Sequence, residues 1–258
     1  VPPLSDADSV TLIRGLRSEA ERYLREMSAR LRTDGARVTT SVSTGEPHQA
    51  ILDAASQSGA SIIAMSTHGR SGLARMVYGS VTEKVLLSTS EVPLLVFRSI
   101  PAESPAPSAA GAGNRIANIL VPYDGSEESL AILPWVERLA QRFGARVVFL
   151  TVTEDVPQSL VTVDETGLDA ACARLTAASV PHTRLVRRGD PVGEILDVCA
   201  EISADLLAMT THWRSGFTRF VLGSVTDALV RRATVTMLLL RCKPKPAVVG
   251  ARSEAASP

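Results

Sequence analysis

The stretch THGRSGLARMVYGSVT, residues 67–82, occurs a second time as THWRSGFTRFVLGSVT, residues 211–226. Eleven of the sixteen positions are identical, and the two copies lie 144 residues apart. The same offset relates GEPHQAIL (45–52) to GDPVGEIL (189–196). This period is much longer than the roughly 20–50 residues of solenoid repeats. The chain therefore contains two homologous domains.

The two domains are joined by a segment with the composition of a flexible linker. Residues 99–115 (SIPAESPAPSAAGAGNR) are rich in proline, alanine, glycine and serine. We therefore expect a first domain at residues 1–98 and a second at residues 116–242. Residues 243–258 have a similar composition and are expected to form a disordered tail.

The overall composition argues against several classes of protein. Lys+Arg and Asp+Glu both number 27 and the pI is about 7.1, whereas proteins that bind nucleic acid through its phosphates carry excess positive charge. No apolar run approaches the roughly 20 residues that cross a bilayer. The three cysteines match neither a zinc site nor a disulfide framework. We expect a cytoplasmic protein without a nucleic-acid or membrane partner.

The second domain alternates strands with helices. Residues 116–124 read as a strand, and Ser126 can cap a helix that ends at Gly144. The continuous apolar run at 145–152 is typical of a strand covered on both faces. Five alternations predict a doubly wound parallel sheet. The remaining expected elements are a helix near 168–178, a strand at 182–189, a helix at 192–203, a strand at 205–211, a helix at 224–233 and a strand at 235–241.

The first domain follows the same pattern only in its later part. Residues 9–35 form a long amphipathic pattern that predicts a helix ending at Gly35, and ARVTTSV (36–42) predicts a strand. Nothing before that helix resembles the first strand–helix–strand of the second domain. We therefore expect the natural chain to be longer by about 40 residues. The alternative is a half-domain that borrows strands from a partner.

The repeated stretch lies where α/β sheets bind ligands, between the carboxyl end of a strand and a helix N-terminus. In the first copy the expected strand ends at Ser66 and the next helix starts at Ser80. Unpaired N–H groups at a helix N-terminus suit a phosphate, and Gly69 and Gly79 let the backbone approach it closely. The pattern therefore indicates an anion site.

A second interpretation needs no ligand. Ser80 with Glu83, and Ser224 with Asp227, have the spacing of capping boxes, in which the serine hydroxyl satisfies the helix N-terminus. No GxxxxGK[ST] sequence occurs, which excludes a P-loop. From the spacing alone, both interpretations remain open.

The repeated stretch resembles the signature of the universal stress protein family, G-x2-G-x9-G-[ST], which follows a strand. ATP-binding members of that family use it to hold the ribose and phosphates. The matching positions are Ser66, Gly69, Gly79 and Ser80 in the first domain, and Thr210, Trp213, Gly223 and Ser224 in the second.

The second domain also resembles the adenine-binding part of that family. ILVPYDGS (119–126) is similar to the family's first strand, in which Asp124 matches the aspartate that contacts adenine and Pro122 precedes it. Val152 matches the residue whose backbone meets the adenine edge. The resemblance implies a bound adenine nucleotide, ATP with Mg²⁺.

Both domains depart from the family signature. Ser66 and Thr210 replace its first glycine, and Trp213 replaces its second. An indole at that position either blocks the pocket or stacks over the ligand, or else it packs at the domain interface. The first domain therefore keeps the better phosphate loop, whereas Asp124 and its strand occur only in the second.

The resemblance implies two α/β domains with five-stranded sheets in the order 3-2-1-4-5, the first lacking its first strand–helix–strand. It also implies that the last strands pair antiparallel, which would make the chain an intramolecular pseudo-dimer, with a homodimer as a further assembly. The leading hypothesis is a stress-response protein that binds ATP as a regulatory ligand. The alternative is a nucleotide-free interaction module. No paired carboxylates, triad or metal cluster supports an enzyme, so we assign neither catalytic residues nor a protein metal site.

Overall fold

The computed structural model describes residues 6–33, 35–66, 79–89, 91–97, 116–153, 166–212 and 223–242. The expected linker and tail, together with Gly69 and Trp213, lie outside the described residues. The chain divides into two compact units, Val1–Ile51 and Leu52–Pro258, each considered by itself. In the described part of the chain, no helix combines the length and apolar character that a bilayer span needs.

The first unit is dominated by helix α1, Asp6–Thr33. The helix predicted at 9–35 is therefore confirmed. Arg17 and Glu21 form an i,i+4 ion pair of 3.1 Å on its surface, as the interleaved charges suggest. Gly35 follows with φ +82°, the left-handed conformation that commonly ends a helix.

The strand predicted at residues 36–42 is wrong. Residues 36–44 have no regular secondary structure, and the described strands include none that pairs with them. A strand exists only through hydrogen bonds to a neighbouring strand, so an extended pattern without a neighbour does not become one. The Val38 carbonyl instead accepts a hydrogen bond of 2.9 Å from the Arg32 side chain. Helix α2, Pro47–Ser58, follows.

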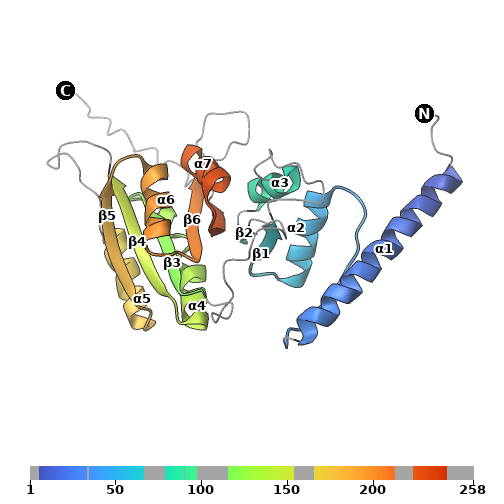
Figure 1. The fold of residues 1–258 in the computed structure, drawn as a ribbon, viewed down its shortest axis with the longest axis horizontal. Coiled ribbons are helices and arrows are strands. Elements are labelled where there is room, and N and C mark those ends of the chain that lie inside the picture. Colours follow the sequence, from blue (N-terminus) through green and yellow to red (C-terminus); the bar gives the residue numbers. More distant parts are fainter. Residues whose placement is uncertain are drawn as a thin grey trace, which may run out of the picture. The chain divides into compact units, whose positions relative to one another are not determined.

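The second unit contains a seven-stranded sheet among its described residues (Figure 1). The strand order across the sheet is β1-β2-β7-β6-β3-β4-β5. The strands are β1 Ile63–Ser66, β2 Leu94–Phe97, β3 Asn118–Tyr123, β4 Arg146–Thr153, β5 His182–Arg188, β6 Leu206–His212 and β7 Thr236–Cys242.

The second domain contributes five of these strands, all parallel to their neighbours within that domain. Numbered along the domain, their order is 3-2-1-4-5, which confirms the expectation. Strand β4 shows why the apolar run at 145–152 is a central strand. Val147 to Leu150 are all buried, on both faces of the sheet.

The last strands of the two domains pair antiparallel, as predicted. Leu94 of β2 lies opposite Leu239 of β7, and neither is accessible to solvent. Two side chains also join the domains. Arg241 of β7 donates to the carbonyl of Leu87 in helix α3, Ser80–Ser88, and Trp135 Nε1 donates to the Ser61 carbonyl at 3.0 Å. The chain thus contains the inter-domain strand pair of a pseudo-dimer.

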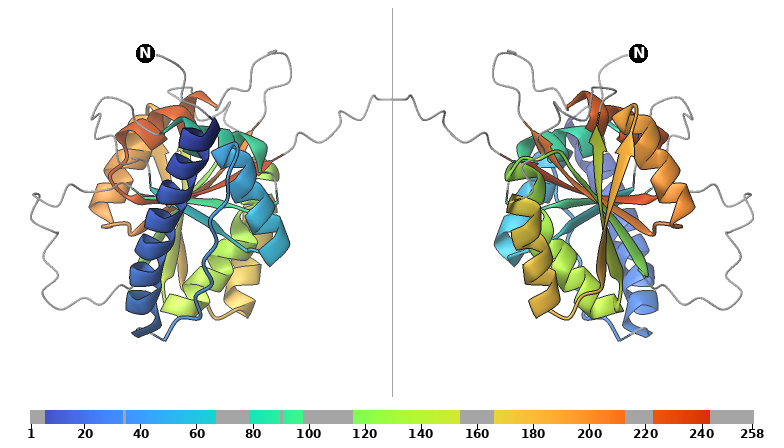
Figure 2. Two further views of the ribbon diagram at one scale, coloured as in Figure 1. Left: turned by 90° about the vertical axis from the view of Figure 1, so that its right-hand side faces the viewer. Right: turned by 90° about the vertical axis from the view of Figure 1, so that its left-hand side faces the viewer.

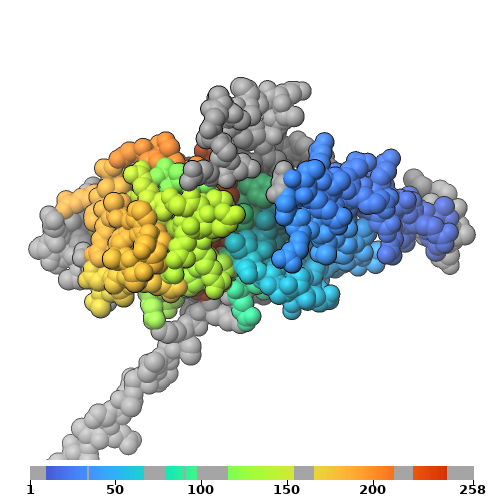
Figure 3. Space-filling view, turned by 90° about the horizontal axis from the view of Figure 1, so that it is seen from below, coloured from blue at the N-terminus to red at the C-terminus, as the bar shows by residue number. Residues whose placement is uncertain are grey.

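Helices cover both faces of the second domain's sheet. Helices α4, Leu133–Phe143, and α5, Thr166–Ala177, lie on one face, and α6, Pro191–Glu201, and α7, Ser224–Arg232, lie on the other (Figure 2). Figure 3 shows α4 and α5 side by side over their face. Full burial of each large apolar side chain contributes about 1.5–3 kcal/mol. The fully buried ones include Ile119, Phe149, Leu175, Leu206 and Leu238.

The single helix expected between Ser126 and Gly144 is two helices in the structure. A short 3-10 helix, η1 Glu128–Leu130, precedes α4. Pro134 explains the break, because it has no N–H to donate and favours the first turn of a new helix. The cap predicted at Ser126 is wrong, because Glu127 is the N-cap of η1 and Ile132 that of α4, although Ser126 Oγ does accept the Ser129 N–H at 3.1 Å. Gly144, at φ +68°, ends α4 as expected.

Candidate functional site

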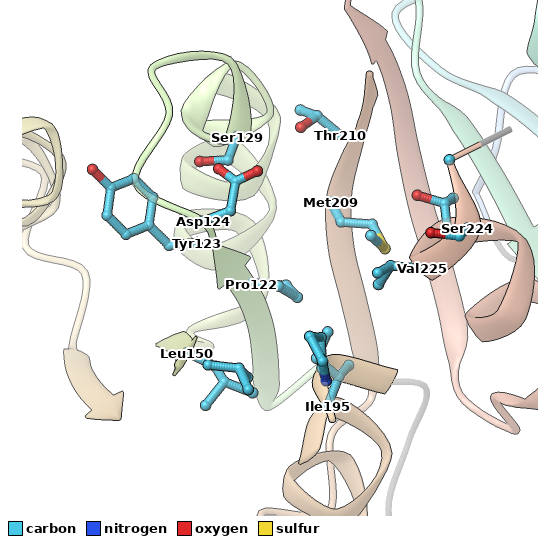
Figure 4. Close-up of a pocket in the computed structure, with 14 residues that line it drawn as sticks. Pro122, Tyr123, Asp124, Ser129, Leu150, Ile195, Met209, Thr210, Ser224 and Val225 are labelled. Atoms are coloured by element: carbon cyan, nitrogen blue, oxygen red, sulfur yellow. The ribbon is translucent and has the colours of Figure 1, made fainter. Parts of the chain in front are cut away.

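A cavity of about 380 Å³ lies at the carboxyl ends of β3, β4 and β6 (Figure 4). This volume falls within the roughly 300–1,000 Å³ of small-molecule pockets. The order of strands and helices along the chain explains why the cavity lies there. The helix after β3 covers one face of the sheet and the helix after β6 covers the other, so a crevice opens between the two strand ends.

Apolar side chains form the walls of this cavity. Pro122 comes from β3, Leu150 from β4, Ile195 from α6 and Met209 from β6, and Figure 4 shows them around one space with Val225 of α7. Walls of this kind suit a flat ring that is mainly apolar on its faces. The cavity can therefore hold a planar heterocycle.

Asp124 lies at the β3 end of the cavity. Its Oδ1 accepts hydrogen bonds from the Ser126 N–H at 3.0 Å and from the Ser126 hydroxyl at 2.5 Å. Gly125 between them has φ +88°, a conformation that glycine adopts without strain. A carboxylate held in this way presents hydrogen-bond acceptors to whatever occupies the cavity.

The N-terminus of α7 forms the other end of the cavity. Gly223 is the N-cap, and no side chain caps the helix. The capping box predicted from Ser224 and Asp227 is wrong, because Ser224 is the first residue inside the helix. Asp227 instead binds the Arg231 guanidinium through two hydrogen bonds of 2.9 and 3.0 Å. The first-turn N–H groups thus have no side-chain cap, and the helix dipole adds positive potential there.

Two largely buried threonines line the cavity between these ends. Thr210 and Thr226 are only 5% and 4% exposed. Within the described residues, neither hydroxyl makes a hydrogen bond, and the same holds for Ser224. Thr210 points from β6 toward the side that Asp124 and Ser129 line (Figure 4). The two hydroxyl oxygens are not fully buried themselves but open onto the cavity, where a ligand or water can supply the partner.

The sequence-predicted residues of the second domain come together in this cavity. All six of them line it, namely Pro122, Asp124, Val152, Thr210, Gly223 and Ser224. Thr226 also lines the cavity and was not predicted, although it belongs to the GSVT sequence that both repeats share. Ile195 was not predicted either, because an apolar position on a helix looks the same in the sequence whether it faces a core or a cavity.

The universal stress protein family model matches residues 1–98 and 116–241. The chain belongs to the universal stress protein family. Among curated relatives, a universal stress protein of Mycobacterium tuberculosis is 28% identical over 197 residues, which cover 70% of this chain and 62% of the relative. One of Mycolicibacterium smegmatis is 26% identical over 220 residues, covering 81% of this chain and 70% of the relative. The alignment therefore spans less than two thirds of the M. tuberculosis protein.

Solved structures of this family share the fold. A universal stress protein from Archaeoglobus fulgidus superposes with a TM-score of 0.70 at 24% identity, covering 93% of this chain and 84% of that one. A protein of Pseudomonas aeruginosa described as a universal stress protein gives a TM-score of 0.61 at 15% identity, covering 86% and 78% of the two chains. At these identities the likeness concerns the fold alone.

The first universal stress domain retains the corner between its strand and its helix. Ser66 ends β1, Gly79 is the N-cap of α3, and Ser80 is the first helical residue, so the first predicted capping box is also wrong. Thr82 Oγ1 lies 3.5 Å from the Ser66 carbonyl, which joins the strand end to the helix. Gly69 lies outside the described residues. The described part of this domain holds no counterparts of β3 and β4.

Two histidines and a cysteine of the described residues lie away from the cavity lining. His182 Nδ1 is 3.0 Å from the Val180 carbonyl, and His48 Nδ1 is 3.7 Å from Glu46. Cys199 is buried in α6, and burial raises the pKa of its thiol to about 11. Across the described ranges, no cluster of three or more metal-ligating side chains occurs.

Proposed function

We propose that the second domain binds an adenine nucleotide in this cavity, with ATP and its Mg²⁺ as a regulatory ligand in a cytoplasmic stress response. The observation that carries the proposal is a cavity lined by the unpaired hydroxyls of Thr210 and Thr226 and by a helix N-terminus without a side-chain cap. Hydroxyls and backbone N–H groups together are the donors that phosphates bind.

The phosphates would lie against α7. Its first-turn N–H groups and the positive end of its dipole face the cavity, where Ser224 and Thr226 add hydroxyl donors. A Cβ placed on Gly223 would meet no heavy atom within 4 Å, so the backbone there is open to close approach. These features together favour an anionic group at this end.

The base would lie between the apolar walls. Pro122, Ile195 and Met209 offer surfaces for the faces of a purine, and Asp124 offers an acceptor to its edge. The two ends of the cavity thus differ in chemistry, with acceptors at β3 and donors at α7. This polarity matches a ligand with hydrogen-bond donors on one end and phosphate on the other.

The Mg²⁺ would arrive with the phosphates. Asp124 is the one acidic residue in the described lining, and it lies at the base end. Magnesium usually keeps several waters and binds substrate phosphates together with one or two carboxylates. The lining is therefore compatible with a metal carried by the nucleotide, which would supply charge neutralisation to its phosphates.

The same separation favours a regulatory ligand over a substrate. General acid–base catalysis requires a titratable group within about 3 Å of the reacting atoms. The Asp124 carboxylate lies at the β3 end, whereas the phosphates would lie at α7. We therefore propose binding without efficient hydrolysis.

Thermal unfolding with ATP, AMP and cyclic AMP tests the proposal. A ligand at 100 times its Kd stabilises the protein by about 2.7 kcal/mol, which raises the Tm of a domain of this size by about 5–10 °C. Thr226→Val removes one hydroxyl with little change of shape, and we expect about tenfold weaker binding. Thr183→Val, the same change on exposed β5, is the control and should bind like the wild type.

Absence of binding to all three nucleotides would refute the proposal. The alternative is then an interaction module, which the β2–β7 pairing favours because that pairing already uses a sheet edge for domain assembly. Such a module would act through association, and a homodimer in light scattering would support it.

A further inference from the structure

Helix α1 exposes an apolar stripe whose counterpart in the second domain is buried. By the 144-residue offset, residues 22–33 of α1 correspond to α5, and both contain the sequence ARL at the same place. Leu175 of α5 has no accessible surface and belongs to a buried cluster with apolar side chains of β3 and β4. Its counterpart Leu31 is 46% exposed. The exposed apolar surface extends along α1 through Ile13, Leu16 and Tyr23. In the second domain a sheet covers the equivalent stripe.

The segment that follows α1 has the side-chain pattern of a strand but no neighbouring strand. Residues 38–44 correspond by the same offset to β5, His182–Arg188. Strand β5 pairs with β4 along its whole length. In the part of the first domain that the structure describes, no strand takes the place of β4. The segment therefore lacks the backbone partner that would make it a strand.

Strand β1 lies at the end of the sheet, whereas its counterpart β6 lies inside it. Residues 206–207 of β6 pair in parallel with residues 119–120 of β3. The offset places residues 62–63 at the same positions of the first domain. Among the described strands, β1 pairs with β2 alone, so its other edge has no strand beside it. Such an edge is a template for one more parallel strand.

We propose that a strand–helix–strand segment, joined to the amino end of α1, completes the first domain. In the second domain one segment, β3 to β4, serves the counterparts of all three surfaces. Its first strand pairs with β6, its second strand pairs with β5, and the sheet that they form buries the stripe of α5 (Figure 2). That segment precedes α5 along the chain. By the repeat, the same polypeptide supplies the equivalent segment before α1.

A simpler occupant would not serve all three surfaces. An amphipathic helix, including α1 of a second copy, could cover the apolar stripe, but its backbone groups are bonded within the helix and offer nothing to β1. A single added strand could pair with β1 but would leave the stripe of α1 in water. The three surfaces, each taken by itself, therefore favour an occupant with two strands. The inference does not depend on nucleotide binding.

Amide hydrogen exchange of two proteins tests the inference. One is the 258-residue chain, and the other carries a copy of residues 116–153 joined to its amino end by a glycine–serine linker as long as residues 154–165. We expect the amides of residues 38–42 to exchange about tenfold more slowly, or slower still, when the copy is present, because they gain a strand neighbour. Leu120→Pro within the copy is the matched control. It keeps the length of the segment but cannot form a central strand, so it should give no protection.

Leu31→Ala gives an independent readout through the Tm. Leu31 is 46% exposed in the 258-residue chain, so the substitution should change the Tm there by less than about 2 °C. With the copy attached, Leu31 becomes a core residue, and the same substitution should lower the Tm by about 5–10 °C. Arg25→Ala is the matched control, since Arg25 and its counterpart Asp169 are both exposed. It should leave the Tm of both proteins within about 2 °C of their parents.

Three results would overturn the inference. The first is unchanged exchange at residues 38–42 when the copy is attached. The second is equal protection from the copy that carries Leu120→Pro, because protection would then not come from strand pairing. The third is slow exchange at residues 38–42 in the 258-residue chain alone. A dimer in light scattering would then identify a second copy as the occupant, and a monomer would show that the chain covers these surfaces itself.

Discussion

Asp205 ties the start of β3 to the start of β6, and its removal should destabilise the second domain measurably. Its Oδ2 accepts the backbone N–H groups of Ala117 at 2.8 Å and of Asn118 at 2.9 Å. The Asp205 N–H also donates to the Asn118 carbonyl at 3.0 Å. The carboxylate thus links backbone segments nearly 90 residues apart, at the amino end of the sheet, away from the cavity.

The size of the effect follows from these contacts. A hydrogen bond to a charged group contributes about 1.5–3 kcal/mol when it is well protected. Asp205 is exposed, so water can hydrogen-bond the Ala117 and Asn118 N–H groups once the carboxylate is removed, which recovers part of the lost stability. For Asp205→Ala we therefore expect a loss of about 2 kcal/mol in the free energy of unfolding, or about 4–8 °C in Tm. Asp205→Asn keeps an acceptor without the charge and should lose about half as much.

Urea denaturation followed by circular dichroism measures the loss, and amide hydrogen exchange at Ala117 and Asn118 locates it. Asp197→Ala is the matched control, since Asp197 is an exposed acid on α6 for which the described residues show no partner. It should lie within about 0.5 kcal/mol of the wild type. The reasoning is refuted if the two alanine variants are equally stable, or if exchange at the two amides is unchanged in Asp205→Ala.

Three further predictions concern the core and the join between the domains. Burial raises the pKa of Cys199 from 9.0 to about 11, so the folded state holds this proton more tightly than the unfolded state. Wild-type stability should thus be full below pH 9 and decline toward pH 11, more steeply than in Cys199→Ala, in urea titrations across that range. Leu207→Ala, in the fully buried part of β6, should cost about 2–5 kcal/mol, whereas Val186→Ala, 63% exposed on β5, should stay within about 0.5 kcal/mol in the same assay. Trp135→Phe removes the hydrogen bond to Ser61 and should cost about 1 kcal/mol, and an unchanged Tm would contradict that role.

The strand order of the second domain could be predicted because its physical cause is local in the sequence. The run at Val147–Leu150 is apolar at successive positions, which suits only a strand with helices on both faces. Alternation with helices then requires parallel crossovers. The antiparallel pairing of β2 with β7 came from the family resemblance, since nothing in LLVF or TMLLLRC specifies which partner these strands take.

The helix N-termini could not be predicted from spacing. The pattern at Ser224 and Asp227 fits a capping box, yet the helix begins one residue earlier than that motif requires, with Gly223 as its cap. Arg231, four residues after Asp227, takes the carboxylate in a two-bond ion pair. A capping box and an i,i+4 pair compete for one side chain, and the sequence does not show which prevails. That competition leaves the first turn of α7 without a side-chain cap.

The extended segment at residues 36–42 fails for a different reason. Its alternating pattern satisfies the local preference of a strand, but a strand also needs a neighbour in register. The break between η1 and α4 has a similar cause. The helical spacing of apolar residues continues across it and suggests one helix, although Pro134 marks the break in the sequence. In both cases the side-chain pattern fits the expected strand or helix. Which secondary structure forms is determined instead by the hydrogen bonds that the backbone can make.

The contrast between the two domains explains why the cavity of this chain lies in the second. The phosphate end of the site needs only a strand, a glycine and a helix N-terminus, and β1, Gly79 and α3 reproduce that corner in the first domain. The proposed base end needs Asp124 and the walls Pro122 and Leu150, which β3 and β4 position. In the described residues, β6 has β3 as a neighbour, whereas β1 pairs with β2 alone. A strand–helix corner without the walls that β3 and β4 supply can hold an anion but not a base, so the nucleotide binding proposed above depends on β3.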